Sequence, residues 1–342
     1  MSKDCRIRMG GVSRHSPFEQ SSIMIDFIEA TICLDKDTPN LGHCKPFPCK
    51  LNQVGWETYT LQGCREMEVH WRPDASLLKV KGSLPYFIQG HNFSFSNADF
   101  VEGVEVLQSI LGVGLWPSYL DAFEYGCIFK VDGKPAEYIR NHTSQPYSKL
   151  YINERGKDKG AFRWWGDSTK SLKLYDAGKN IKMKQGLKER EVIQKCGYDP
   201  ECNYLKFEVH WNKPQLLNSG RGIVLENLQN PEWIGTLSAT LIEQYKLLKP
   251  MRTLQQPISK KDLSAIDIAV NVLVESMMEQ GIPIEETRKQ VYAYINGARC
   301  LDKRDKDARK ATFRRAFGRL KESEVSQWDL TSKIEEALAV EV

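Results

Sequence analysis

Two short stretches of the chain alternate apolar and polar side chains in a way that could assemble a site for phosphodiester chemistry. They lie at 171–175 (SLKLY) and 204–210 (YLKFEVH). Successive side chains of a β-strand point to opposite faces of the sheet, so each stretch would present its polar members on one face. Those members are Lys173 and Tyr175 in the first stretch, and Lys206, Glu208 and His210 in the second. If the two strands are neighbours, these side chains share one surface.

The chemistry available to such a surface is strand transfer. A carboxylate is a hard oxygen ligand for Mg²⁺ or Mn²⁺, which polarises a phosphoryl oxygen. A nearby lysine can stabilise the added charge or lower the pKa of a phenol. A tyrosine can then act as the nucleophile, and the phosphotyrosine that it forms conserves the energy of the broken bond, so sealing needs no ATP. The same residues also fit an ordinary polar sheet face, and their types alone leave both interpretations open.

The formal net charge of +4 conceals an uneven distribution of charged residues. Residues 149–195 contain 13 basic and six acidic side chains, and residues 299–321 contain ten basic and three acidic ones, so each block carries +7. The rest of the chain sums to −10. Two separate basic blocks on an acidic chain favour surfaces that bind a polyanion, and nucleic acid is the first partner to consider.

Length and composition narrow the class of protein. The chain has 342 residues, 41% of them hydrophobic, and no apolar run approaches the roughly 18 residues that a membrane span needs. We therefore expect a soluble protein that does not enter a membrane. The nine cysteines are odd in number and irregular in spacing, and the N-terminus lacks the apolar core of a secretion signal. These features predict a location in the cytoplasm.

The elements that must position the polar residues are strands. Stretches rich in β-branched and aromatic residues, bounded by turn signals, predict strands at 23–33, 67–71, 77–82, 120–131, 162–165, 171–175 and 204–211. Apolar residues at helical spacing predict a helix at 99–111. Helices that interrupt a mostly antiparallel sheet are typical of an α+β fold.

The texture changes near 255–257, after which the pattern becomes helical. Helices are predicted at 265–278, 285–295 and 304–320. We therefore expect an N-terminal arm at 1–21, an α+β domain at 22–257 and a small all-α domain at 258–342, which ends in an acidic surface tail. The third helix places Arg309, Arg315 and Arg319 largely off its apolar stripe, which suits either a DNA-binding or oligomerisation unit or a solvated charged face.

Four blocks, in the same order along the chain, carry a family resemblance. They are MIDFIEATI, LKVKGSLPYFIQGHNFSF, FRWWGDSTKSLKLYDAGK and YLKFEVHW. These blocks resemble the Met-Ile-Asp, Ser-Pro-x-x-Phe-x-x-Gly-His-Asn, Gly-Ser with Tyr-Lys, and Arg-Phe-Glu segments of rolling-circle replication initiators of the filamentous-phage gene II family. The resemblance spans roughly residues 22–215 and leaves the helical domain uncovered.

The resemblance implies roles for individual residues. Tyr175 falls at the family's nicking tyrosine. Asp121 and Glu208 fall at acidic positions expected to bind Mg²⁺ or Mn²⁺, and Asp26 of the opening strand is either a third ligand or a structural hydrogen-bonding residue. His91 and Asn92 match Gly-His-Asn, and their position in the family motif is compatible with contact to DNA, to metal or only to a turn.

Two departures from the family pattern concern basic residues. The lysine expected three residues after the tyrosine is replaced by Gly178, so either Lys179 or Lys173 would assist the nucleophile. The arginine of Arg-Phe-Glu is Lys206, which keeps the charge but loses bidentate phosphate geometry. Lys206 and Arg163 are further candidates for contact with DNA.

The function implied is nicking of one strand at a phage replication origin. The enzyme would bind double-stranded and single-stranded origin DNA, form a 5′-phosphotyrosine, leave a 3′-OH for host polymerase and helicase, and later close the displaced circle in the host cytoplasm. A single tyrosine per chain calls for a homodimer or for a second nucleophile such as Tyr147 or Tyr151, whose spacing is used by initiators with a His-x-His metal pair that this chain lacks. A DNA-binding regulator without catalysis and a hydrolytic endonuclease are the alternatives.

Overall fold

The computed structural model describes most of the chain and all the strands considered below. The described residues are 24–35, 37–46, 55–144, 149–152, 162–185, 189–250, 254, 264–279, 282–320 and 326–339. Tyr147 lies outside them, and so do the whole predicted N-terminal arm, 1–21, and its junction with the first strand.

The fold is built on one ten-stranded sheet in which every neighbouring pair of strands runs antiparallel. Its order is β2 (Cys44–Pro46), β3 (Glu57–Leu61), β4 (Met67–Arg72), β5 (Leu77–Ser83), β1 (Met24–Cys33), β6 (Tyr119–Val131), β11 (Asn203–Trp211), β10 (Lys170–Asp176), β9 (Phe162–Gly166) and β8 (Lys149–Ile152). The predicted α+β fold is therefore confirmed. The two stretches that opened the sequence analysis are the neighbouring strands β10 and β11.

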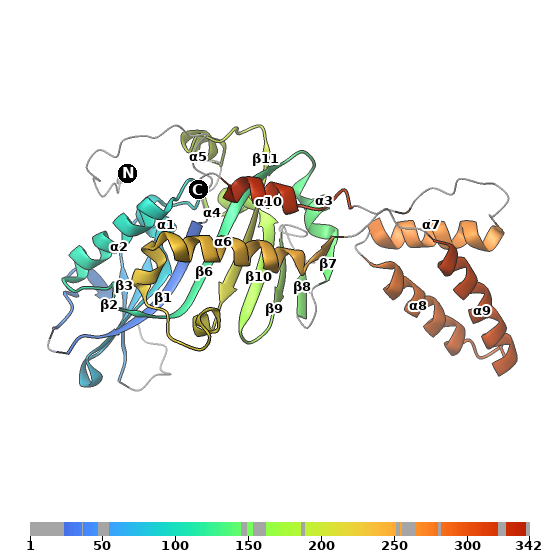
Figure 1. Cartoon of the computed structure of the whole chain (residues 1–342), viewed down its shortest axis with the longest axis horizontal. Coiled ribbons are helices and arrows are strands. Elements are labelled where there is room, and N and C mark those ends of the chain that lie inside the picture. Colours follow the sequence, from blue (N-terminus) through green and yellow to red (C-terminus); the bar gives the residue numbers. More distant parts are fainter. Residues whose placement is uncertain are drawn as a thin grey trace.

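Helix α6 (Pro231–Lys246) lies across one face of this sheet, with α10 (Thr331–Leu338) beside it (Figure 1). The other helices that pack into the main core are α1 (Leu84–Gln89), α2 (Asn97–Leu111), α3 (Pro135–Arg140), α4 (Ala177–Gln185) and α5 (Glu189–Lys195). Helix α6 buries Leu237, Leu241 and Tyr245, which recur every four residues, and the Tyr245 ring packs against Phe207 of β11. The apolar side chains of β11 thus point toward α6, and its polar side chains point to the opposite face.

The next three helices form a separate body at one end of the molecule (Figure 1). They are α7 (Ala265–Glu279), α8 (Ile284–Gly297) and α9 (Lys303–Arg319), and they share an apolar cluster of their own around Val270, Val274 and Phe317. A small two-stranded sheet of β7 (His142–Ser144) and β12 (Lys249–Pro250) precedes this body in the chain. The domain boundary at 257/258 lies outside the described residues and stays a prediction.

The last helix corrects the expectation of an acidic surface tail. Helix α10 returns to the sheet domain, beside α6 and over β6 (Figure 1). Leu330, Ile334 and Ala337 are buried in the main core, because the acidic residues of this segment occupy the outer face of an amphipathic helix. The predicted all-α domain therefore ends before this segment.

A buried hydrogen-bond chain fixes α10 to the domain. The imidazole of His142 donates from Nδ1 to the carbonyl of Tyr138 (2.7 Å), so Nε2 of the neutral ring accepts from the Tyr245 hydroxyl at 2.8 Å. Burial lowers the pKa of His142 to about 4, which keeps the ring neutral at physiological pH. The Tyr245 oxygen in turn accepts from the backbone N–H of Leu330 at 2.6 Å.

Within the part of the chain that the structure describes, no helix combines the length and the apolar character required to cross a bilayer.

We predict that Tyr245→Phe destabilises the protein by about 1–3 kcal/mol, because it leaves the Leu330 N–H and the His142 ring buried without this partner. Chemical denaturation monitored by circular dichroism measures the loss. Tyr294→Phe is the matched control, since that ring is 84% exposed and should unfold as the wild type does. Equal midpoints for the two variants would contradict this role of the hydroxyl.

Candidate active site

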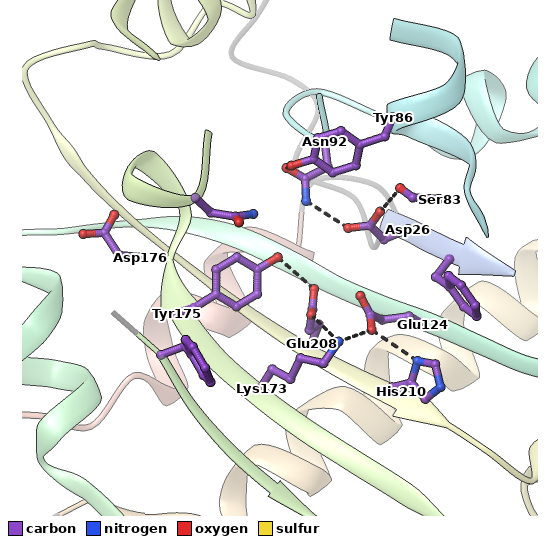
Figure 2. Close-up of a pocket in the computed structure, with 13 residues that line it drawn as sticks. Asp26, Ser83, Tyr86, Asn92, Glu124, Lys173, Tyr175, Asp176, Glu208 and His210 are labelled. Atoms are coloured by element: carbon purple, nitrogen blue, oxygen red, sulfur yellow. Dashed lines mark hydrogen bonds and ion pairs between the residues drawn. The ribbon is translucent and has the colours of Figure 1, made fainter. Parts of the chain in front are cut away.

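Four adjacent strands in the middle of the sheet bring three carboxylates together. The ligand atoms of Asp26 on β1, Glu124 on β6 and Glu208 on β11 all lie within 4.8 Å of one another, and the three residues are buried. Two of them, Asp26 and Glu208, are candidates from the sequence. All three lie on the sheet face opposite α6, where β10 adds Lys173 and Tyr175 (Figure 2).

A bulge in β1 brings Asp26 into this cluster. Ile25 pairs with Tyr125 and Phe27 pairs with Glu124, so Asp26 is an extra residue between two consecutive pairs. A bulge bends the strand and redirects a side chain, which allows Asp26 and Phe27 to serve the same site although they are consecutive. The Asp26 carboxylate accepts hydrogen bonds from Ser83 Oγ (2.5 Å) and Asn92 Nδ2 (2.9 Å).

Asp121, which was predicted to be a metal ligand, lies outside this cluster. A second bulge between β1 and β6 leaves Asp121 without a pairing partner on β1, although Leu120 and Ala122 on either side of it are paired. This bulge lies near the N-terminal end of β6. The Asp121 carboxylate accepts from Thr31 Oγ1 (2.6 Å) and pairs with Lys79 Nζ (2.9 Å). Glu124, three residues later, occupies the position in the carboxylate cluster that was expected for Asp121. The sequence signal that could have indicated Glu124 is an acidic residue isolated within a long apolar strand.

Two lysines bind the carboxylates together. Lys206, with no exposed surface, pairs with Asp26 and with Glu208 Oε2 (2.8 Å). Lys173 pairs with Glu124 Oε2 (2.5 Å) and with Glu208 Oε1 (3.1 Å). The sequence left open which lysine accompanies the tyrosine, and the contacts favour Lys173 over Lys179. The backbone N–H of Lys179 donates to Asp176, and its side chain does not line the site cavity.

A cavity of about 520 Å³ opens onto the cluster. Besides the three acids, the described residues that line it are Phe27, Ser83, Tyr86, Asn92, Phe162, Lys173, Tyr175, Asp176, Asn180 and His210 (Figure 2). His210 Nδ1 lies 3.2 Å from Glu124 Oε2, and its ring packs on Phe27. Gly126 makes room for the central acid, since a Cβ there would lie 2.7 Å from Cβ of Glu208. The volume is sufficient for a phosphodiester and an attached sugar or base.

Asp26 and Glu124 are charged at neutral pH although they are buried. Burial alone would raise the pKa of Glu124, but the Lys173 ammonium and the hydrogen bond with His210 lower it to about 2. Burial likewise opposes ionisation of Asp26, and the charge of Lys206 outweighs it, so this pKa is also lowered. The same attraction holds the pKa of Lys206 well above its usual value despite complete burial.

This charge balance tests whether a divalent cation fits. Three carboxylates against two ammonium groups leave one negative charge in a buried site, and all the acidic ligand atoms are the hard oxygens that Mg²⁺ and Mn²⁺ prefer. A divalent ion would turn the balance to +1, which complements one phosphodiester. Among the described residues no other group of three acidic, histidine or cysteine side chains is arranged for metal binding. The residues therefore fit the ion.

The Tyr175 phenol is linked to the cluster directly. Its hydroxyl donates to Glu208 Oε2 at 3.0 Å, and the Lys206 ammonium lies 5.8 Å from the ring centre. Burial and the Glu208 charge raise the pKa of Tyr175 well above 10, while Lys206 opposes the rise. The phenol is therefore protonated in this arrangement, with a carboxylate already positioned on its proton.

The predicted DNA-contacting residues near the sheet are distributed differently. Asn92 orients Asp26, and Lys206 is inside the carboxylate cluster. His91 is turned toward Cys196 Sγ, 3.7 Å from Nε2, and burial lowers its pKa to about 4. Arg163 is buried on the core face, where it donates to the His142 carbonyl (2.6 Å), so direct contact of Arg163 with DNA is contradicted. Strand parity explains this, since Arg163 pairs with the core residue Leu174.

The predicted contacts of the helical body lie on α9. Arg309 and Arg315 are exposed there, whereas Arg319 pairs with Asp267 of α7. The rival nucleophile Tyr147 lies outside the described residues. The backbone of Tyr151, on β8, pairs in register with Trp164 of β9. None of these positions tests binding of DNA, which stays a prediction.

No protein-family model matches the chain, and no curated protein sequence matches it. Among solved structures, the chain is similar to a rolling circle replication initiator protein from Geobacillus stearothermophilus. The two share 12% sequence identity with a TM-score of 0.38, and the match covers 70% of this chain and 89% of that chain. A likeness at this level establishes neither function nor close kinship.

The carboxylate cluster predicts a loss of stability in acid. A group whose pKa is lowered by folding stabilises the protein above its unfolded pKa, and this stabilisation disappears as the pH falls through the folded pKa. For Glu124 the window runs from 4.5 down to about 2 and amounts to a stabilisation on the order of 3 kcal/mol. Glu124→Gln should flatten the decline of unfolding free energy in this window.

Urea denaturation at a series of pH values measures the effect. The control is Glu68→Gln, which changes an exposed glutamate on β4. That variant should keep the slope of the wild type. An unchanged slope in Glu124→Gln would show that the ion pairs do not hold this carboxylate ionised.

Proposed function

We propose that this protein nicks and closes DNA, with Tyr175 as the nucleophile. The observation that carries the proposal is the 3.0 Å hydrogen bond from the Tyr175 hydroxyl to Glu208, a member of a buried three-carboxylate cluster. A phenol in contact with a group that can take its proton has the arrangement required for nucleophilic catalysis. The open cavity beside it admits a phosphodiester.

In the proposed reaction, the Tyr175 oxygen attacks phosphorus while its proton passes to Glu208. The bond from phosphorus to the 3′-oxygen breaks, and this oxygen takes up a proton from solvent, to which Glu208 returns its own. The products are a 3′-OH and a 5′-phosphotyrosine. Lys173, between Glu124 and Glu208, is positioned to stabilise charge on the non-bridging oxygens. Closing reverses these steps, with the 3′-OH attacking the phosphotyrosine.

Asp26, Glu124 and Glu208 would hold Mg²⁺ or Mn²⁺ in this scheme. The bound ion would supply positive charge to polarise the phosphoryl group. Asp26 is oriented for this role by Ser83 and Asn92, and Glu124 by His210.

The biological setting proposed is rolling-circle replication of a filamentous phage in the cytoplasm of its host. It rests on the four sequence blocks, each of which contributes a residue to the same site, namely Asp26, Asn92, Tyr175 and Glu208. We further propose that α9 contacts the origin DNA through Arg309 and Arg315, that host helicase and polymerase extend the 3′-OH, and that a second protomer provides the tyrosine for termination. A basic exposed helix face suits the first of these roles.

Tyr175→Phe should abolish the covalent protein–DNA adduct and leave DNA binding intact. Supercoiled origin plasmid is incubated with protein and Mg²⁺, and adducts are read on a denaturing gel together with relaxed circles. Tyr86→Phe is the matched control, because this second phenol lines the same cavity and its hydroxyl donates to the amide oxygen of Asn92. It should keep forming adduct.

The same assay separates the alternatives. Cuts without a protein-linked 5′ end would indicate a hydrolytic endonuclease, and binding without any cuts would indicate a regulator. An adduct that persists in Tyr175→Phe would sink the assignment of the nucleophile.

Glu124→Gln should raise the Mg²⁺ concentration needed for half-maximal nicking by about 10-fold or more, since even loss of an outer-shell partner costs ~10–100-fold in metal affinity. Titration of nicking with Mg²⁺ gives the value. Asp121→Asn changes an acid of the same strand that lies outside the cluster, and its requirement should match that of the wild type. The reverse result would return the ligand role to Asp121.

A further inference from the structure

Strand β9 presents two aromatic side chains on the face that carries the candidate active site. Phe162 pairs with Tyr175 and Trp164 pairs with Lys173, so both rings share a face with the residues of β10. Because they are two residues apart on one strand, their Cα atoms are separated by roughly 6.7 Å. Phe162 lines the site cavity, and Trp164 follows it on the same face of β9, outside the described lining of the cavity.

Trp164 is unusual among the aromatic residues of the sheet in being 38% exposed. Its neighbour Trp165 points to the core and has no exposed surface. The indole of Trp164 lies over Gly166, since a Cβ on that glycine would be 3.0 Å from Nε1 and 3.4 Å from Cε2. A side chain at position 166 would displace the ring, so the glycine allows the indole to lie along the strand with surface open to solvent.

The Trp164 side chain lies one strand away from the charged groups of the site. Across the face, Trp164, Lys173 and Glu208 occupy one register line on three successive strands. Lys173 contacts both Glu124 and Glu208, so a phosphate held there has Trp164 one strand away. Adjacent strands are about 4.8 Å apart, which is within the reach of a base attached to the next sugar.

We infer that Trp164 is a stacking platform for the base of a nucleotide that flanks the phosphate at Tyr175. The ligand class is an unpaired nucleobase, because only a base that has left the duplex stack offers a free ring face. This inference rests on the proposed function for the location of the phosphate. The subsite selects unpaired nucleotides at the point of cleavage and leaves sequence reading to other residues.

Binding of single strands in the Tyr175→Phe background tests the inference without cleavage. The probes are a labelled oligothymidylate of about 20 nucleotides and an oligomer of equal length made of abasic deoxyribose phosphates, which has the same charge and no bases. The parent should bind the thymidylate more tightly than the abasic oligomer. Trp164→Ala should weaken thymidylate binding about 5- to 140-fold and leave abasic binding unchanged.

Two variants control for structure. Trp164→Phe keeps a ring and should restore most of the affinity for thymidylate, which a general disturbance of β9 would not allow. Tyr119→Ala removes an aromatic residue of β6 that is 61% exposed and lies outside the site cavity, and it should bind both probes as the parent does.

Equal affinity of Trp164→Ala and the parent for thymidylate would overturn the inference, and so would an equal loss for the two probes. Nicking is scored separately with Tyr175 present. A protein that shows base-dependent binding through Trp164 but forms no adduct would keep the stacking subsite and lose the proposed function. A protein that forms the adduct but binds the two probes equally well would keep the proposed function and lose the stacking subsite.

Discussion

The arrangement of the site depends on one electrostatic constraint, which is that three buried carboxylates face one another within 4.8 Å. Isolated charges of this kind are too costly to bury, so the fold must supply compensating groups at fixed positions. Lys206 and Lys173 supply two of them, and each bridges a pair of acids. The remaining negative charge suits the site to a cation, and the whole charged cluster makes this part of the sheet polar inside an otherwise apolar core.

The antiparallel order of the strands satisfies this constraint. Strands β1, β6, β11 and β10 are consecutive neighbours in the sheet although they are far apart in the chain, and each contributes a charged residue or the phenol. Alternation along β10 and β11 can be read from the sequence, so the shared face of Tyr175 and Glu208 was predictable. Their exact pairing was not, because register depends on the whole sheet.

Bulges mark the limit of what the sequence reveals. Alternation counted from Asp121 gives no hint that this residue is looped out of register, or that Glu124 pairs opposite Phe27 and reaches the cluster. The prediction that Arg163 contacts DNA rested on its position in a basic block, whereas strand parity turns its side chain inward. Helix α6 did carry a signal, with Asn230 as its cap, Pro231 in its first turn and Leu237, Leu241 and Tyr245 along one stripe. The core position of α10 depended on contacts distant in sequence, which no local pattern encodes.

The return of α10 to the sheet changes the mechanical relation between the two bodies. The chain leaves the sheet domain after β12 and is part of it again at Leu330. The three-helix unit is therefore an insertion that is connected to the sheet domain at both of its ends. A two-point attachment limits rotation more than a single tether does, so α7–α9 stay within a restricted range of positions relative to the candidate active site. The unit can also be exchanged or excised in evolution without severing the core, because insertions whose ends join at a domain surface are well tolerated.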